Sequence, residues 1–209
     1  MVGPEIYLTI LRKGKSPMTF RYAAFAFSLA AVAISAPATA ADYKIDTDNA
    51  HASITFRIKH LGFSWLTGRF DKFTGTFTYD DKNPDASKVK VEIDTTSVDT
   101  NFALRDKHIR DAQLLDTDAF PKATFESTSI KASGDGKAVV TGNLTLHGVT
   151  KQISFNAEHI GGGKDPWGGY RDGFTGTTEL TLADYGIKRD LGPAAKTVEL
   201  TLNIEGVRQ

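Results

Sequence analysis

Residues 50 to 60 read AHASITFRIKH, and this stretch decides the fold class. Every second side chain from Ala50 to Ile58 is apolar, and the side chains between them are polar or charged. Successive side chains of a β-strand point to opposite faces, so this alternation predicts a strand with one buried and one solvated face. His60 continues the apolar side at the end of the run.

The same alternation recurs along the rest of the chain. Clear runs occur at 73–79, 88–94, 143–146, 152–157, 174–182 and 198–205, and weaker ones at 43–46, 63–70 and 124–131. Turn-forming sequences separate them at 80–84, 134–136, 147–150 and 161–163. The pattern predicts about eight or nine strands. One segment departs from it: capping residues at 99–101 followed by helix formers predict a short helix over 102–109, with a second turn at 112–115.

An all-β chain of this kind can form a two-sheet sandwich or a closed barrel, because alternation alone does not separate the two. Glycines inside the predicted strands, at Gly68, Gly75, Gly142 and Gly176, suit the close approaches of a curved sheet, although ordinary bulges also use them. We therefore favour a closed antiparallel eight-stranded barrel. A barrel of eight strands is just filled by side chains or holds one small ligand.

The first 40 residues predict export. Residues 18–40 carry an arginine, an apolar stretch and the small-residue triplet Ala38-Thr39-Ala40, as a cleaved signal peptide does. Residues 1–17 form an upstream extension of unclear role. The apolar stretch is shorter than the ~20 residues that span a bilayer, so no stable membrane insertion is expected.

The remaining residues, 41–209, predict a single domain. Removing the four basic and one acidic residues of the first 40 positions leaves 21 basic and 24 acidic residues, so no nucleic-acid partner is expected. The chain has no cysteine, which excludes disulfides and thiolate metal sites.

Several segments, taken together and in order, resemble the YceI-like family of periplasmic polyisoprenoid-binding proteins. They are residues 41–46, 56–62, 95–100, 105–110, 120–125, 142–151, 165–169 and 190–193, which span nearly all of the predicted domain. The resemblance implies a lipocalin-like barrel whose apolar cavity takes an isoprenoid tail, such as that of a polyprenyl alcohol, a polyprenyl phenol or an isoprenoid quinone. It also implies a periplasmic protein that binds, sequesters or transports this lipid.

The predicted inward faces supply a candidate ligand-binding wall. It consists of Phe56, Ile58, Phe73, Phe77, Val91, Ile93, Phe125, Leu146, Phe155, Leu182 and Leu202. Each residue taken singly is better explained as plain core. His60, Phe63, Trp65 and Arg105 are candidates for a rim that contacts the head group, and structural hydrogen bonding or ion pairing is the alternative for His60 and Arg105.

An enzyme acting on an isoprenoid quinone or its precursor is the alternative function, with His60, Arg105 or His108 at the barrel mouth. No nucleophile signature and no close metal-ligand spacing of histidines supports it, so neither catalytic residues, a metal nor another cofactor is predicted. A third hypothesis is an interaction module with a filled barrel, which would bind through the predicted loop at 164–173. The sequence leaves a homodimer open.

Overall fold

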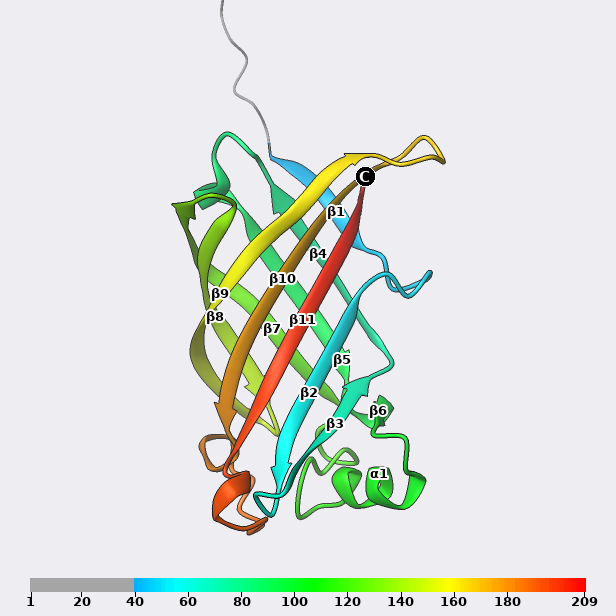
Figure 1. Cartoon of the computed structure of the whole chain (residues 1–209), viewed down its shortest axis with the longest axis vertical. Helices are drawn as coiled ribbons and strands as arrows, with labels where there is room; N and C mark the ends of the chain where they lie inside the picture. The colour runs from blue at the N-terminus through cyan, green and yellow to red at the C-terminus, as the bar shows by residue number, and fades with distance from the viewer. Residues whose placement is uncertain (1–39) are drawn as a thin grey trace, which may run out of the picture. The chain divides into compact units, whose positions relative to one another are not determined.

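The structure is a computed structural model that describes residues 40–209 (Figure 1). The predicted signal peptide and upstream extension lie outside these residues, apart from Ala40. The described part contains eleven strands, one α-helix and four short 3₁₀ turns. The strands are β1 (Ala41–Ile45), β2 (Ser53–His60), β3 (Ser64–Phe70), β4 (Phe73–Tyr79), β5 (Lys88–Asp94), β6 (Val98–Asp99), β7 (Lys122–Gly134), β8 (Lys137–Leu146), β9 (Val149–Lys164), β10 (Tyr170–Thr181) and β11 (Thr197–Arg208). The helix is α1 (Ala103–Arg110).

Eight of these strands form a closed antiparallel ring. Its order is β1, β4, β5, β7, β8, β9, β10 and β11, and the ring closes because β1 pairs with both β4 and β11. The barrel prediction is therefore confirmed, and the sandwich is excluded. Where β1 lies between β4 and β11, the backbone hydrogen bonds at the edges of both neighbours are satisfied between strands.

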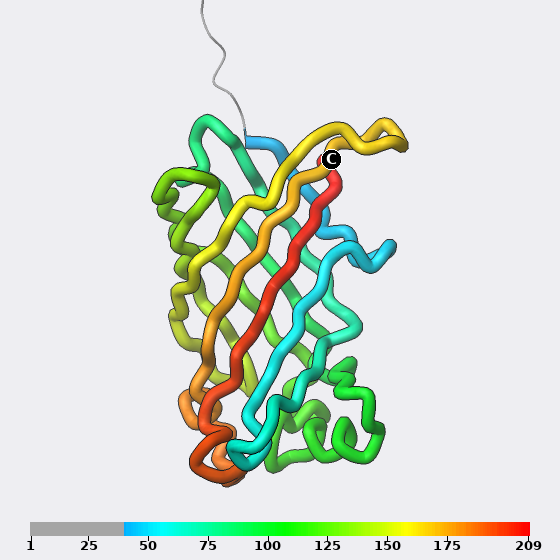
Figure 2. Tube along the Cα trace, viewed as in Figure 1, coloured from blue at the N-terminus to red at the C-terminus, as the bar shows by residue number. Residues whose placement is uncertain are grey.

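Strands β2, β3 and β6 lie outside the ring. The end of β11 at Gly206–Arg208 pairs with β1, whereas residues Glu199–Asn203 pair with β2. Figure 2 follows the chain from β1 in blue through a turn into β2 in cyan, both beside β11 in red. β3 then pairs with β2, and the two-residue β6 pairs with β3. The sheet thus widens beyond the ring at the end where α1 lies (Figure 1).

Side-chain alternation explains why these segments are strands. On β11, Leu200 and Leu202 face the barrel interior, and Glu199 between the apolar positions pairs outside with Arg57 of β2 at 2.6 Å. Glycine allows the interior to pack closely: a Cβ added at Gly142 on β8 would overlap the ring of Phe125 on β7. The position of Gly142 inside a predicted strand suits such a close approach, which the structure confirms.

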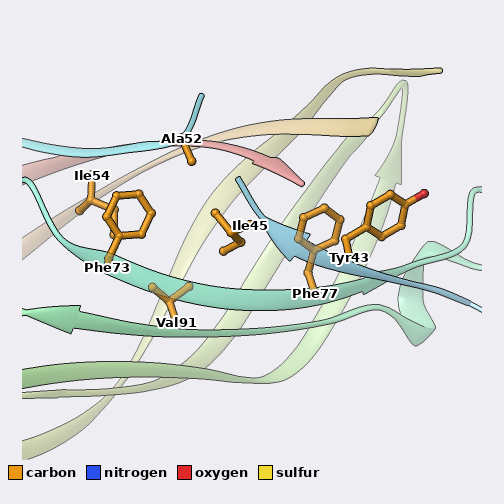
Figure 3. Packing of buried hydrophobic residues seen from close by; sticks show 7 residues of the cluster. All are labelled: Tyr43, Ile45, Ala52, Ile54, Phe73, Phe77 and Val91. Atoms are coloured by element: carbon orange, nitrogen blue, oxygen red, sulfur yellow. The ribbon is translucent and has the colours of Figure 1, made fainter. Parts of the chain in front are cut away.

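Two clusters of buried side chains fill part of the interior. The first joins β1, β2, β4 and β5, and Figure 3 shows its members: Tyr43, Ile45, Ala52, Ile54, Phe73, Phe77 and Val91. The second contains Phe125, Val140, Leu144, Leu180 and Tyr185. Together the clusters show that the apolar faces predicted from the alternation do point inward.

Three predictions of local structure are wrong. The triglycine at 161–163 is not a turn, because β9 continues to Lys164. The predicted loop at 164–173 shrinks to residues 165–169. Leu182 begins a 3₁₀ turn (Leu182–Tyr185) rather than ending a strand, although it was predicted from the alternation.

The helix prediction is confirmed, but its capping differs from the expectation. The N-cap position is Phe102, which offers no side-chain hydrogen bond. Instead the Asp106 carboxylate accepts a hydrogen bond from the backbone N–H of Thr100 at 2.8 Å. A side chain in the first turn of the helix therefore fixes the backbone of the segment that precedes the helix.

Candidate functional site

The barrel encloses a cavity of about 410 Å³, within the size range of small-molecule sites. Its wall is formed by the inward faces of β4, β5 and β7 to β11, with one residue from β2. The large aliphatic and phenylalanine members of the wall are Ile54, Phe77, Val89, Val91, Ile93, Phe125, Ile130, Val140, Leu144, Ile153, Phe155, Phe174, Leu200, Leu202 and Ile204. Such a surface is suited to a hydrocarbon chain, because most of its side chains offer no hydrogen-bonding partner.

The mouth of the cavity lies at one end of the barrel. The acidic and lysine residues that line the cavity lie at the connection from β4 to β5 and at the tight turn from β7 to β8: Asp81, Lys88, Asp135 and Lys137. Thr175 and Thr178 of β10 add hydroxyl groups further along the wall. Helix α1 lies at the other end (Figure 1). The mouth therefore has two carboxylates and two amines, and these charges balance.

A chain of three polar side chains lies at this end of the interior. The Tyr43 hydroxyl on β1 donates to Oδ2 of Asp172 on β10 at 2.6 Å, and Nε2 of His159 on β9 lies 2.8 Å from Oδ1 of the same carboxylate. The Asp172 side chain is only 5% exposed, so these hydrogen bonds take the place of water around a buried carboxylate. His159 itself lines the cavity.

The environment keeps the Tyr43 hydroxyl protonated. Burial, and after it the hydrogen bond to Asp172, raises the pKa of Tyr43 well above its ordinary value of 10. Its ring also stacks on Phe77, with ring centroids 4.7 Å apart. Tyr43 therefore stays a hydrogen-bond donor to Asp172 over the whole physiological pH range.

A β-bulge places His159 and Asp172 on the same face. Phe174 pairs with His159 and Gly173 pairs with Gly161, so Ile160 is an extra residue in β9 and is 68% exposed. Without the bulge, the inward position after His159 would be residue 161. The extra residue Ile160 moves it by one, so that Gly162 is the inward residue opposite Asp172. A Cβ at Gly162 would overlap the Asp172 carboxylate, so the absent side chain leaves the space that Asp172 occupies.

The comparisons with known proteins agree with this architecture. A family model described as "YceI-like domain" matches residues 43–206. The chain belongs to the YceI-like family. The resemblance noted in the sequence is thereby confirmed. No helix of residues 40–209 is long and apolar enough to cross a membrane.

Relatives of this YceI-like chain cover most of its length. A UPF0312 protein of Pseudomonas aeruginosa (strain LESB58) is 62% identical over 172 residues, which are 82% of this chain and 90% of that protein. The crystal structure of the Campylobacter jejuni YceI protein has 26% sequence identity and a TM-score of 0.66, covering 73% of this chain and 90% of that one. A polyisoprenoid binding domain from Saccharophagus degradans has 20% identity and a TM-score of 0.59, covering 80% of this chain and 98% of that one.

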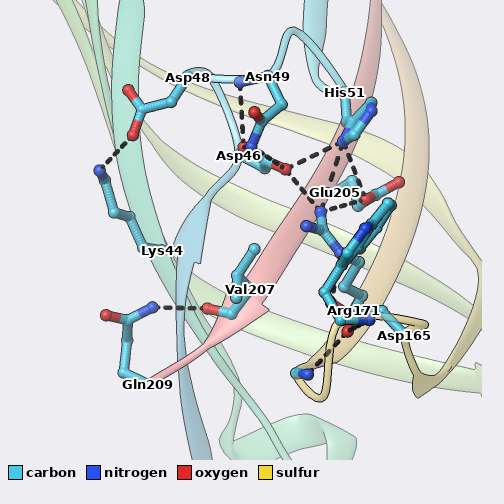
Figure 4. A network of polar contacts seen from close by, with 12 residues as sticks. Lys44, Asp46, Asp48, Asn49, His51, Asp165, Arg171, Glu205, Val207 and Gln209 are labelled. Carbon is cyan, nitrogen blue, oxygen red and sulfur yellow. Dashed lines mark hydrogen bonds and ion pairs between the residues drawn. The ribbon is translucent and has the colours of Figure 1, made fainter.

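A second polar cluster lies on the outside of this YceI-like barrel (Figure 4). Arg171 Nη1 donates to Asp46 and to Glu205, both at 2.6 Å, and Arg171 Nε donates to Asp165 at 2.9 Å. Burial alone would raise the pKa of the Asp46 carboxyl, but hydrogen bonds from Arg171, His51 and Asn49 hold it well below its ordinary value. The Asp46 and Glu205 hydrogen bonds raise the pKa of Arg171, so the guanidinium is always charged.

The same cluster contains the atoms that could hold a metal ion. Asp46, His51 and Glu205 each offer a ligand atom, and these lie within 4.8 Å of one another. However, Arg171 Nη1 already hydrogen-bonds two of the three residues and lies 3.5 Å from His51 Nδ1. The guanidinium supplies the positive charge that a metal would bring, so the donor set fits an ion-pair network better than a metal centre.

The structure divides the candidate wall residues into two groups. Six of them line the cavity: Phe77, Val91, Ile93, Phe125, Phe155 and Leu202. Five others are not part of its lining: Phe56, Ile58, Phe73, Leu146 and Leu182. Phe56 packs against Phe70 where β2 and β3 extend past the ring, and Phe73 belongs to the first buried cluster. A role in ligand binding stays a prediction for both groups.

The candidate rim residues lie away from the mouth. His60, Phe63 and Trp65 are exposed on the hairpin of β2 and β3, where Arg57 stacks on the Trp65 ring at 4.3 Å. Arg105 on α1 donates to the hydroxyl and the carbonyl oxygen of Thr100, both at 2.7 Å. Trp65 and Arg105 therefore make structural contacts at the end of the barrel that carries α1, and a role at the head group stays a prediction for all four residues.

The polar chain of Tyr43, Asp172 and His159 was not identified from the sequence. One signal for His159 was present: it continues the alternating inward positions of Ile153, Phe155 and Ala157. A histidine in phase with an apolar face is either a satisfied core residue or a polar group facing a cavity. Asp172 gave no such signal, because its neighbours on the sequence are arginine and glycine and the bulge hides its pairing with β9.

Proposed function

We propose that this protein binds an isoprenoid lipid in the barrel cavity and keeps it out of water. The observation that carries the proposal is the composition of the wall, in which fifteen large aliphatic or phenylalanine side chains face the cavity and the aspartate and lysine residues are concentrated at the mouth. Burying each CH₂ group contributes about 0.8 kcal/mol, so a prenyl chain needs no specific contact to bind tightly. The polyisoprenoid binding domain from Saccharophagus degradans, which shares this fold, supports the choice of ligand.

We infer binding or transport rather than catalysis. The residues considered for an enzyme do not meet at the cavity: His60 and His108 are exposed, and Arg105 is held by Thr100. Sequestration requires only the apolar wall and the mouth. An isoprenoid quinone, a polyprenyl phenol and a polyprenyl alcohol all present a tail suited to this wall.

We also propose that the protein acts in the periplasm after removal of residues 18–40 as a signal peptide. The family and the sequence pattern of these residues support this location. Sequencing the N-terminus of protein recovered from the periplasm tests it. A mature chain that begins near Ala41 is expected, and protein retained in the cytoplasm with its first 40 residues would contradict the proposal.

A variant that fills the cavity tests the binding proposal. Ala157 and Ala138 are paired across β9 and β8, and both line the cavity. Ala157→Phe places a ring in the vacant space and should lower the affinity for a prenyl alcohol at least tenfold, measured by displacement of a fluorescent lipid. Ala112→Phe adds the same ring at an exposed position and should bind as the parent protein does. Equal affinity in a folded Ala157→Phe variant would contradict a ligand in the barrel.

A second measurement needs no variant. Native mass spectrometry of protein purified from its own periplasm should show an adduct that organic extraction identifies as an isoprenoid. Repeated recovery of protein without an adduct, together with no binding of added prenyl lipids, would defeat the proposal.

A further inference from the structure

The inference concerns the polar head of the ligand and rests on the proposed function. Within the cavity lining, His159 is a polar ring at the level of the mouth: its backbone N–H donates to the carbonyl oxygen of Gly136, in the turn between β7 and β8, at 2.8 Å. The rings of Tyr79 and Phe174 contact it, with centroids 5.2 and 4.9 Å away, and hold its orientation. A lipid with its tail in the apolar wall would bring its head group to this level.

The hydrogen bonds of Asp172 determine which imidazole nitrogen carries a proton. A carboxylate can only accept hydrogen bonds, and the Tyr43 hydroxyl already donates to Oδ2. Nε2 of His159 must therefore donate its proton to Oδ1, 2.8 Å away. In the neutral imidazole the other nitrogen, Nδ1, is then an acceptor with a free lone pair. No side-chain hydrogen bond among residues 40–209 uses Nδ1 of His159.

We propose that His159 Nδ1 accepts a hydrogen bond from a hydroxyl head group, so that the protein selects isoprenoid alcohols, phenols or quinols over ligands whose head group only accepts. Tyr43 and Asp172 are positioning residues, which fix the tautomer and the ring from behind. His159 is thus the residue that distinguishes ligands with the same tail.

The charge of the mouth agrees with a neutral head group. Asp81 and Asp135 balance Lys88 and Lys137 among the residues that line the cavity, so the mouth offers no net positive charge for a phosphate. A phosphate site usually gathers arginine side chains or several backbone N–H groups around the anion. A hydroxyl needs one acceptor, which His159 provides.

Two probes with the same tail test the inference on the unmodified protein. Geranylgeraniol and its methyl ether differ only in the methyl group that replaces the hydroxyl hydrogen, and their affinities are compared by displacement of one fluorescent lipid at pH 8. The alcohol should bind about fivefold more tightly, which is the effect of one net hydrogen bond. Equal affinities, or tighter binding of the ether, would overturn the role of His159 while leaving the lipid cavity intact. If neither probe binds, the proposed function itself fails.

A histidine variant then assigns the preference to one residue. His159→Gln keeps an amide N–H to donate to Asp172, and its acceptor oxygen is bonded to the same carbon as that nitrogen rather than lying at the position of Nδ1, so the ratio of the two affinities should fall to about one. His108→Gln makes the same change on the exposed face of α1 and should keep the fivefold ratio. A preference unchanged in His159→Gln would contradict the assignment. The tail should bind to both variants, which shows that they are folded.

Discussion

Two polar clusters lie on opposite faces of one strand. Arg171 and Asp172 are neighbours on β10, yet Arg171 faces outward to Asp46, Asp165 and Glu205, whereas Asp172 faces inward to Tyr43 and His159. In the outer cluster the charged groups are paired with one another, since Arg171 forms ion pairs with three carboxylates. The inner cluster leaves one nitrogen of His159 without a protein partner among the described residues. The difference separates a structural network from a site open to a ligand.

The largest expected effect comes from removing the outer cation. Arg171→Met leaves the Asp46 carboxylate, whose side chain is 4% exposed, without its main partner. Removing one partner of a buried ion pair leaves the other charge buried and unpaired. We therefore expect the free energy of unfolding, measured with urea, to fall by about 3 kcal/mol. The affinity for prenyl alcohol should not change. A stable Arg171→Met variant that loses the lipid would break the comparison between the two clusters.

Acid should weaken the outer cluster next. The pKa of Asp46 is lower in the folded chain than its ordinary value of 3.8, so its contribution is fully present above that value. As the pH falls below it, the unfolded chain binds a proton first and stability is lost, by about 1 kcal/mol between pH 5 and pH 3. Urea unfolding at these two values checks the loss. In Arg171→Met the loss from this carboxyl should be absent, and an unchanged pH dependence would contradict the assignment to Asp46.

A matched pair of glycine variants sharpens the description of the inner cluster. Gly162→Ala forces the Asp172 carboxylate to move, which disturbs its hydrogen bonds to Tyr43 and His159, whereas a Cβ at Gly163 meets nothing within 4 Å. We expect Gly162→Ala to lower the affinity for geranylgeraniol about threefold, a change worth about 0.6 kcal/mol, with the affinity for its methyl ether unchanged. Gly163→Ala should leave both affinities as they are. Equal behaviour of the two variants would show that Asp172 does not position His159.

The smallest effect is expected from the exposed edge of the outer cluster. His51 contacts Asp46 at 3.0 Å, but its side chain is 44% exposed and Arg171 already neutralises the carboxylate. His51→Gln should therefore change the free energy of unfolding by less than about 0.5 kcal/mol at pH 7. A larger loss, measured with urea beside Arg171→Met, would mean that His51 rather than Arg171 holds the cluster together.

The local alternation predicted well which residues face inward, but it did not predict which of these residues line the cavity. Phe155 and Phe56 look alike in the sequence, since each continues an alternating apolar face, but Phe155 lines the cavity and Phe56 packs where β2 runs past the ring. Alternation reports which side of a strand is apolar and carries no information on how far the neighbouring strands extend. The position of the mouth was missed for the same reason, because it depends on which loops meet at one end.

The sequence by itself determined that the chain is all-β with an apolar face on each strand, because the period of two is a local property of each strand. The family motifs, which cover the domain, indicated the barrel. Only the tertiary structure decided which polar groups meet inside it. Tyr43, His159 and Asp172 come from β1, β9 and β10, and a one-residue bulge at Ile160 brings two of them onto one face. Closure of the ring brings Tyr43 close to Asp172, since β1 becomes a neighbour of β11 only when the barrel closes.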